Sequence, residues 1–171
     1  MRTGPSRSDD FGEIIIFKPG VSEIKKSLEA INKILPSDVI AIPYYSQLEQ
    51  HKKTYIEQLY SVEVAKLNIE KNQDFSSEFK DERDFKTNCL NGNGKYKRII
   101  IIATNILEAS TTIKSAKYVI DTGTQKVNKY DYKKRGEKLI LENISETSRI
   151  QRRGRVGRIS SGTVYYLYEK N

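Results

Sequence analysis

The chain has 171 residues, which is enough for one domain with a hydrophobic core and short for two. Its 30 Lys and Arg residues outnumber 22 Asp and Glu residues, and the net charge of +8 favours a polyanionic partner. The single cysteine, Cys89, excludes an intramolecular disulfide, and the single histidine, His51, excludes a histidine metal cluster. No apolar run is long enough to span a membrane and no signal peptide opens the chain, so we expect a soluble, intracellular protein without a membrane partner.

The first part of the chain alternates strand-like and helix-like segments. Residues 1–10 are polar and predict a disordered leader, or a remnant of expression, outside the fold. Glu13–Phe17 is a short β-rich run, and the apolar residues of Val21–Leu35 recur at helical spacing, with Ser22 as the expected N-cap. Val39–Ile42 predicts the next strand. A strand, a helix and a second strand in this order indicate a βα unit of a parallel sheet.

The middle of the chain contains a second helix-like segment and an interval without clear periodicity. Apolar residues between Leu48 and Leu59 recur at helical spacing. The interval Ser61–Lys97 is charged and rich in asparagine, and we expect a helix around Glu63–Glu70 followed by a surface loop. Arg98–Ala103 is apolar on both faces, as a central parallel strand should be.

The last third of the chain predicts a strand, a hairpin, a helix and a final strand. Lys117–Asp121 is apolar, and Val127–Tyr132 and Lys138–Leu141 flank a polar turn with a glycine, so a projecting β-hairpin is expected. Ser145 should cap the next helix, and Gly162–Tyr168 is a strand of alternating aromatic residues. The whole pattern predicts an α/β fold with a mostly parallel sheet, helices on both faces and a projecting β-hairpin.

An arginine-rich run lies in the helix that follows the hairpin. It reads Ser-Arg-Ile-Gln-Arg-Arg-Gly-Arg-Val-Gly-Arg and ends at Arg158. If the run is helical, Gln151, Arg155 and Arg158 share one face, where the fixed fork of each guanidinium matches phosphate oxygens. Glycine inside a helix costs about 1 kcal/mol relative to alanine. Gly154 and Gly157 therefore favour a backbone pressed against a ligand or another domain over the alternatives, a solvated basic patch or a nuclear-localisation run.

This run resembles motif VI, Q-R-x-G-R-x-G-R, of superfamily 2 helicases. Upstream, the segment Arg98–Ile113 contains A-T-N-I-L-E-A-S-T-T-I, which resembles motif V of the DEAH-box class, and Tyr118–Gly123 resembles the D-x-G strand end that follows it. Departures from the class pattern are Ala109 and Lys114, which put the detailed ribose contacts in doubt. Two long motifs in the correct order make a chance resemblance improbable.

Motif IV resembles the class more weakly. Ile14–Gly20 followed by Glu23 is similar to its strand and P-G-x-x-E-I pattern, and Pro43–Leu48 to the segment after it. The resemblance covers the chain except its first ten residues and the interval 61–97, where an insertion is expected. Within the class, the chain is most similar to poxvirus-type nucleoside triphosphate phosphohydrolase II, a viral RNA helicase.

The resemblance implies that residues 11–171 form a helicase C-terminal domain, the second of two RecA-like domains in an NTP-dependent RNA helicase, with DNA as a second possible substrate. Its partners would be the nucleic acid and the first RecA-like domain of the same polypeptide. That first domain would hold most of the ATP, or another NTP, and Mg²⁺. No G-x-x-x-x-G-K-[ST] loop and no D-E-x-H box occur in the sequence, so this chain alone should not hydrolyse NTP. A viral origin would place the protein in the cytoplasm or the virion.

The resemblance also assigns site residues. It implies catalytic roles for Gln151, Arg155 and Arg158, with Arg158 as the arginine finger. The nucleotide-binding set adds Arg152, Asp121 and Gly123. The nucleic-acid-binding set is Lys18, Pro19, Gly20, Thr104, Asn105, Ser110 and Thr112. No metal ligand is expected.

Alternatives stay open for several of these residues. The hydroxyl and amide side chains of motif V could be ordinary caps and turn formers, Asp121 could form a core turn, and Arg152 could be structural or interdomain. Glu108 is a poor phosphate ligand, and we expect it to organise its loop or to link the ATP and RNA sites. The basic hairpin turn, with Lys133, could lever against RNA or be merely solvated. The whole domain could also be a non-catalytic nucleic-acid-binding module or a nucleotide-dependent scaffold.

Overall fold

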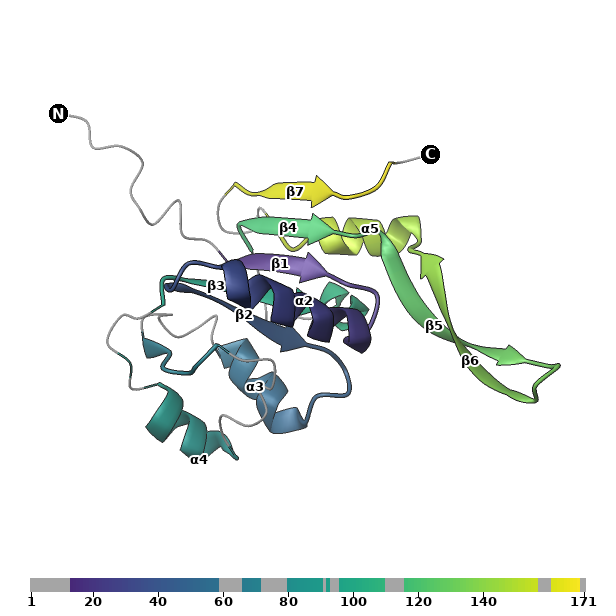
Figure 1. Cartoon of the computed structure of the whole chain (residues 1–171). Coiled ribbons are helices and arrows are strands. Elements are labelled where there is room, and N and C mark those ends of the chain that lie inside the picture. Colours follow the sequence, from purple (N-terminus) through teal and green to yellow (C-terminus); the bar gives the residue numbers. More distant parts are fainter. Residues whose placement is uncertain are drawn as a thin grey trace.

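The computed structural model describes residues 13–58, 66–71, 80–90, 92, 96–109, 116–156 and 161–169. Its centre is a five-stranded sheet with the order β2-β3-β1-β4-β7, in which every neighbouring pair is parallel (Figure 1). The strands are β1 (Ile14–Phe17), β2 (Val39–Tyr44), β3 (Arg98–Ala103), β4 (Tyr118–Asp121) and β7 (Thr163–Tyr166). The predicted parallel sheet is confirmed, although β2 is longer and β7 shorter than the sequence pattern indicated.

The two faces of the sheet carry separate hydrophobic clusters. Successive residues of a strand point to opposite faces, so Ile101 belongs to one cluster whereas Ile100 and Ile102 belong to the other. All residues of β3 after Arg98 are buried, which confirms the prediction of a central strand apolar on both sides. The sheet therefore needs cover on both faces.

Helix α2 (Val21–Ile34) covers one face, where its Ile24 and Leu28 are buried against β3 and β2. The prediction that Ser22 caps this helix is wrong. The helix begins at Val21, its N-cap is Gly20 in extended conformation, two residues before Ser22, and no side chain bonds to the cap position. On the edge strand β2, the Asn32 amide accepts from Ala41 N at 3.0 Å and donates to Ala41 O at 3.2 Å, so α2 also satisfies part of an otherwise open sheet edge.

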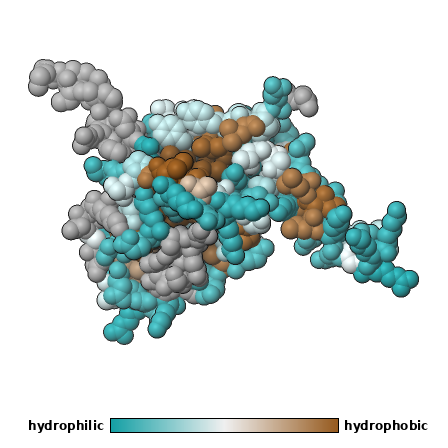
Figure 2. Space-filling view, in the orientation of Figure 1, coloured by the Kyte–Doolittle hydropathy of each residue, from teal (hydrophilic) through white to brown (hydrophobic). Residues whose placement is uncertain are grey.

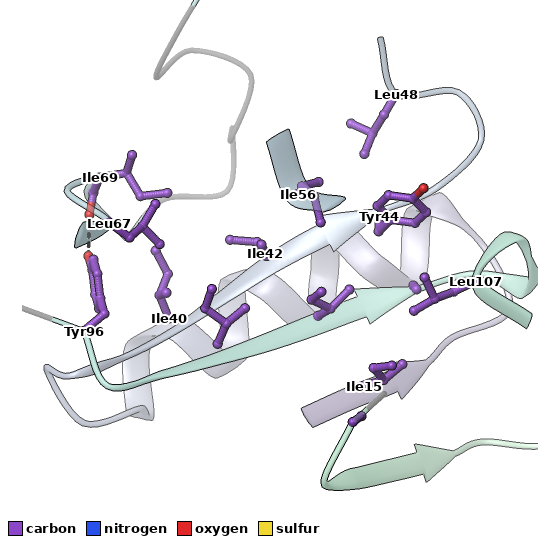
Figure 3. Close-up of a cluster of buried hydrophobic side chains, with 14 of the residues drawn as sticks. Ile15, Ile40, Ile42, Tyr44, Leu48, Ile56, Leu67, Ile69, Tyr96 and Leu107 are labelled. Carbon is purple, nitrogen blue, oxygen red and sulfur yellow. Dashed lines mark hydrogen bonds between the residues drawn. The ribbon is translucent and has the colours of Figure 1, made fainter. Parts of the chain in front are cut away.

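The opposite face is covered by α3 (Gln50–Gln58) and the π-helical turn η3 (Phe85–Cys89), and α4 (Glu82–Asp84) leads directly into η3. Figure 3 shows Ile56, Leu67 and Ile69 above this face, with the Tyr96 hydroxyl donating to the Ile69 carbonyl. The predicted helix around Glu63–Glu70 is wrong in its described part. Residues 67–70 are not helical, and their burial alternates, as in an extended segment.

The hairpin consists of β5 (Thr124–Asp131) and β6 (Gly136–Asn143), and it projects away from the sheet as predicted (Figure 1). Both strands are longer than the sequence pattern indicated. Helix α5 (Glu146–Arg153) follows and packs against β4 and the 3-10 turn η4 (Asn105–Glu108). The predicted N-cap is confirmed, since Ser145 Oγ accepts a hydrogen bond from Ser148 N at 3.1 Å.

Candidate nucleotide and nucleic-acid interface

The carboxyl ends of the parallel strands bring three of the predicted motifs to one edge of the sheet. Motif IV follows β1, motif V follows β3, and the Asp121 segment ends β4. Lys18 N donates to Ala103 O at 2.8 Å, so the first two loops are joined directly. Ligands of parallel α/β sheets bind at this edge, because the loops that leave the strands converge there.

A cavity of about 280 Å³ lies where motifs IV and V meet. Pro19 and Gly20 line it together with Thr104 and Asn105, so the fold joins four residues of the predicted nucleic-acid set. Lys18 immediately precedes them at the end of β1. Asn105 is exposed, whereas only 9% of the Thr104 surface is accessible. No side chain caps the start of α2, where the first backbone N–H groups of a helix have no intrahelical acceptor and suit an anion.

Sequence reasoning missed Lys126, which also lines this cavity. Its Nζ lies 2.6 Å from Glu23 Oε1, and its backbone N donates to Pro19 O at 3.1 Å, so β5 is fastened to the start of α2. Desolvation, the largest single cause, raises the pKa of the Glu23 carboxyl, but the hydrogen bond from Lys126, a backbone hydrogen bond and the charge of nearby lysines together outweigh it, so the net pKa is lowered. A Cβ at Gly20 would lie 2.9 Å from Lys126 Cδ, so a larger residue there would require the Lys126 side chain to shift. The predicted hairpin strand began after Lys126, which is why the residue was overlooked.

A second cavity, of about 330 Å³, lies where the ends of β4 and β7 meet the start of α5. Thr122, Gly123, Arg149 and Tyr168 are among the residues that line it. Gly123 has φ +76°, a left-handed conformation that favours glycine, and a Cβ there would meet the Tyr168 ring at 2.4 Å. The predicted nucleotide-binding Gly123 thus has a conformational reason to be glycine that does not depend on a ligand.

Arg152 is wholly buried and forms the centre of a polar network. Its Nε donates to Glu108 Oε1 at 2.9 Å, its Nη1 to Asp121 Oδ1 at 2.8 Å and its Nη2 to Thr124 O at 3.3 Å. The guanidinium carbon lies 4.8 Å from the centre of the Phe17 ring. The planar guanidinium carries its donors on separate nitrogens in a fixed geometry, so one arginine reaches two carboxylates and a carbonyl at separate positions.

Asp121 is also wholly buried, and its carboxylate is shared among three donors. Besides Arg152, these are Gly123 N at 2.8 Å and the Tyr168 hydroxyl at 3.0 Å. Burial first, and then the hydrogen bond to the Asp121 carboxylate, raise the pKa of Tyr168 above its usual value. Neither Arg152 nor Asp121 reaches the surface. This geometry fits a structural role for Arg152 and a core turn formed by Asp121.

The helix of motif VI ends too early for Gln151, Arg155 and Arg158 to share one helical face. Helix α5 stops at Arg153, Gly154 is its C-cap with φ −65° and ψ −5°, and Arg155 lies beyond it. Gly154 therefore ends the helix, which corrects the expectation of glycine within it. A Cβ at Gly154 would lie 3.4 Å from the nearest atoms, the carbonyl oxygens of Gln151 and Ile150, so the described residues do not press on this backbone.

The predicted catalytic residues differ in exposure. Gln151 is exposed, whereas Arg155 is 5% accessible and its Nη2 donates to the Glu108 carbonyl oxygen at 2.9 Å. Glu108 thus binds Arg152 through its carboxylate and Arg155 through its backbone, as expected for a residue that organises the loop. Arg158, Ser110 and Thr112 lie outside the described residues.

Two further observations concern the described part of the chain. No group of three or more His, Cys, Asp or Glu side chains gathers there in a way that would hold a metal ion. None of the helices within the described ranges is both long enough and apolar enough to cross a bilayer.

The parallel sheet, its covered faces, its motif loops at the carboxyl edge and the antiparallel hairpin define a RecA-like α/β domain of the helicase type. Residues 7–160 match the family described as the helicase conserved C-terminal domain. The chain belongs to this family, as the C-terminal domain of a DEAH-type superfamily 2 helicase.

Similar proteins include viral and bacterial RNA helicases. The chain is 39% identical over 160 residues to R366 of Acanthamoeba polyphaga mimivirus, named as an ATP-dependent RNA helicase; the match covers 94% of this chain and 9% of R366. It is 31% identical over 163 residues to the ATP-dependent RNA helicase HrpA of Escherichia coli K12, with 95% of this chain and 10% of HrpA covered. Among solved structures, the E. coli DExH-box NTPase HrpB superposes with a TM-score of 0.63 at 25% identity, covering 96% of this chain and 17% of HrpB. The chain thus spans about a tenth of the curated relatives' length.

Proposed function

We propose that the chain is the half of an ATP-dependent RNA helicase that supplies part of the RNA track and the arginine side of the NTP site. Glu108 carries the proposal, because this one residue holds both sides. It follows Thr104 and Asn105 in motif V, and it bonds to Arg152 and Arg155 of motif VI. A displacement of motif V would therefore displace motif VI, and the reverse.

The RNA track runs through the cavity between motifs IV and V. The backbone of Pro19 and Gly20 and the side chains of Thr104 and Asn105 would contact phosphate and ribose, with Ser110 and Thr112 of the same motif continuing the contact and Lys18 beside them. These groups are short and polar, so they can contact an RNA strand and still leave room for it. RNA is the first choice of substrate, because the relatives are named as RNA helicases, and DNA is the second.

The NTP site is shared with the first RecA-like domain of the parent polypeptide. That domain would hold ATP or another NTP with its Mg²⁺. Bound Mg²⁺ would neutralise charge on the phosphates. Gln151 would orient the attacking water or the γ-phosphate, and Arg155 and Arg158 would stabilise the charge that develops during transfer.

Arg152 and Asp121 have a supporting role in this proposal. Both are fully buried and ion-paired with each other, so they would hold the nucleotide-facing residues in place without touching the nucleotide. Gly123 would act in the same way, through its backbone N–H on Asp121. Closing of the two domains on NTP and their reopening after hydrolysis would move the strand.

The isolated chain should not hydrolyse NTP, with or without RNA, at any Mg²⁺ concentration, because it lacks a phosphate-binding loop and a D-E-x-H box. The test is phosphate release from the purified chain beside the full-length parent. Turnover by the chain alone, abolished by replacing one of its residues, would contradict the proposal. The poxvirus-type subtype and a location in the cytoplasm or virion stay predictions.

One observation favours a second function, a nucleic-acid-binding module without chemistry. The hairpin turn exposes Lys133, Lys134 and Arg135 away from the sheet, where they could bind a polyanion unaided (Figure 1). A parent protein whose RNA-stimulated hydrolysis survives Arg155→Ala would favour this module. Hydrolysis that stays dependent on Arg155 but is not stimulated by RNA would instead favour a nucleotide-dependent scaffold.

A further inference from the structure

Tyr168 lies outside the helicase motifs, just after β7, yet it touches the network that holds them together. Its hydroxyl donates to Asp121 Oδ2 at 3.0 Å. Its ring packs on Gly123, where a Cβ would come within 2.4 Å of the ring. The hydroxyl therefore reaches Asp121 from a ring whose position is fixed by contact with the backbone.

Hydrogen bonds lead from this hydroxyl to the arginines of motif VI. Asp121 Oδ1 accepts from Arg152 Nη1 at 2.8 Å, and Arg152 Nε donates to Glu108 Oε1 at 2.9 Å. The Glu108 carbonyl then accepts from Arg155 Nη2 at 2.9 Å. Asp121 and Arg152 are both completely buried, so each bond lies in a medium of low dielectric, where its geometry is strongly enforced.

We propose that Tyr168 is a positioning residue for RNA-stimulated NTP hydrolysis. Its hydroxyl fixes the rotation of the Asp121 carboxylate, so that Arg152 holds Glu108 in one orientation and Glu108 in turn holds Arg155. The inference rests on the proposed function of motif VI. It adds a residue that makes no contact with RNA or nucleotide but determines where the catalytic arginine is held.

The cavity beside Tyr168 explains why the hydroxyl matters. Tyr168 lines a cavity of about 330 Å³, and water from it could replace the missing hydroxyl as a donor to Asp121. Water would satisfy the carboxylate without fixing its rotation. The expected result of removing the hydroxyl is therefore a misplaced Arg155 in a folded domain, with turnover lowered roughly threefold to tenfold, the size expected for one ordinary hydrogen bond.

The experiment uses Tyr168→Phe in the full-length parent helicase, because phenylalanine keeps the ring on Gly123 and removes only the hydroxyl. The matched control is Tyr166→Phe, whose ring packs edge-on against Tyr168 with centroids 5.7 Å apart and which is 40% exposed. We expect a lower kcat for RNA-stimulated hydrolysis in Tyr168→Phe alone, with KM for NTP, RNA affinity and melting temperature unchanged. In an Asp121→Asn background, Tyr168→Phe should have no additional effect on kcat.

A merely structural role would lower the melting temperature and the active fraction while leaving turnover per active site unchanged, and that result would overturn the proposal. Normal kcat in Tyr168→Phe, with kcat strongly reduced by Arg155→Ala, would also overturn it and leave the proposed function standing. Normal turnover in Arg155→Ala would remove the proposed function and the role of Tyr168 together. Additive effects of Tyr168→Phe and Asp121→Asn on kcat would show that the hydroxyl does not act through Asp121.

Discussion

The two arginine- and lysine-rich segments of the domain lie in opposite environments. After the hairpin, Arg152 and Arg155 are buried and bonded to Glu108. At the turn of the hairpin, Lys133 and Lys134 are exposed. Similar residue types thus serve the interior of the domain in one segment and face solvent in the other.

This contrast shows that the total charge says little about which cations bind a polyanion. A buried guanidinium is retained because removing it leaves its carboxylate partners desolvated and unpaired. An exposed lysine contributes little to folding and is available to phosphate. Figure 2 adds that the hairpin has an apolar patch nearer the sheet and a hydrophilic outer end; Leu139 and Leu141, each 57% exposed, lie in its returning strand.

Arg152→Ala tests this contrast between buried and exposed cations most directly. This change leaves the Glu108 and Asp121 carboxylates buried without their cation, so we expect the free energy of unfolding to fall by about 3–5 kcal/mol. Arg153→Ala is the matched control, because Arg153 is the next residue and is exposed. It should cost less than about 0.5 kcal/mol. Urea unfolding of the three proteins measures both values, and equal midpoints for Arg152→Ala and wild type would refute the structural role.

Arg155→Ala and Arg158→Ala test the catalytic side of the same segment. In the full-length parent, each should lower kcat by about a hundredfold or more and spare RNA binding, because an arginine that meets the γ-phosphate acts in the transition state. Arg153→Ala again serves as control. Steady-state hydrolysis and RNA titration separate the two effects, and near-normal turnover in both variants would dismiss the motif VI assignment.

Local signals in the sequence predicted the elements well. The isoleucine run of β3 and the Ser145 cap depend on neighbours within a few residues, and both are confirmed. The end of α5 is also a local signal, since glycine after basic residues is a common helix stop, but the helical spacing of Gln151 and Arg155 favours a longer helix.

The buried network could not be predicted from spacing. Arg152 meets Glu108 and Asp121, which are 44 and 31 residues away in the sequence. Periodicity identifies the face of a helix and not the residues opposite it. Only the order of strands in the sheet brings these three residues together, and the same holds for Lys126 and Glu23 at the nucleic-acid cavity.

Neutral and charged RNA contacts can be distinguished next. Thr104→Ala combined with Thr112→Ala should lower the RNA affinity of the domain to a similar degree for every sequence, because backbone contacts carry no base code. The slope of log affinity against log salt should barely change, since neutral hydroxyls release no counterions. Fluorescence titrations with two unrelated single strands at several salt concentrations measure both quantities. Unchanged affinity would remove motif V from the RNA track.

The smallest expected effect concerns the exposed cations. Lys133→Ala with Lys134→Ala should leave unfolding unchanged, because both side chains are solvated. If the hairpin only assists the motif V track, RNA affinity should fall modestly and the salt slope should flatten by about 0.7 for each phosphate of a single strand that the variant no longer neutralises. Glu137→Ala is the control, because Glu137 lies beside the same turn, in β6, but has the opposite charge. It should weaken neither the RNA affinity nor the salt dependence. Loss of all binding in the lysine variant, with binding intact in Thr104→Ala and Thr112→Ala, would move the track from the sheet edge to the hairpin.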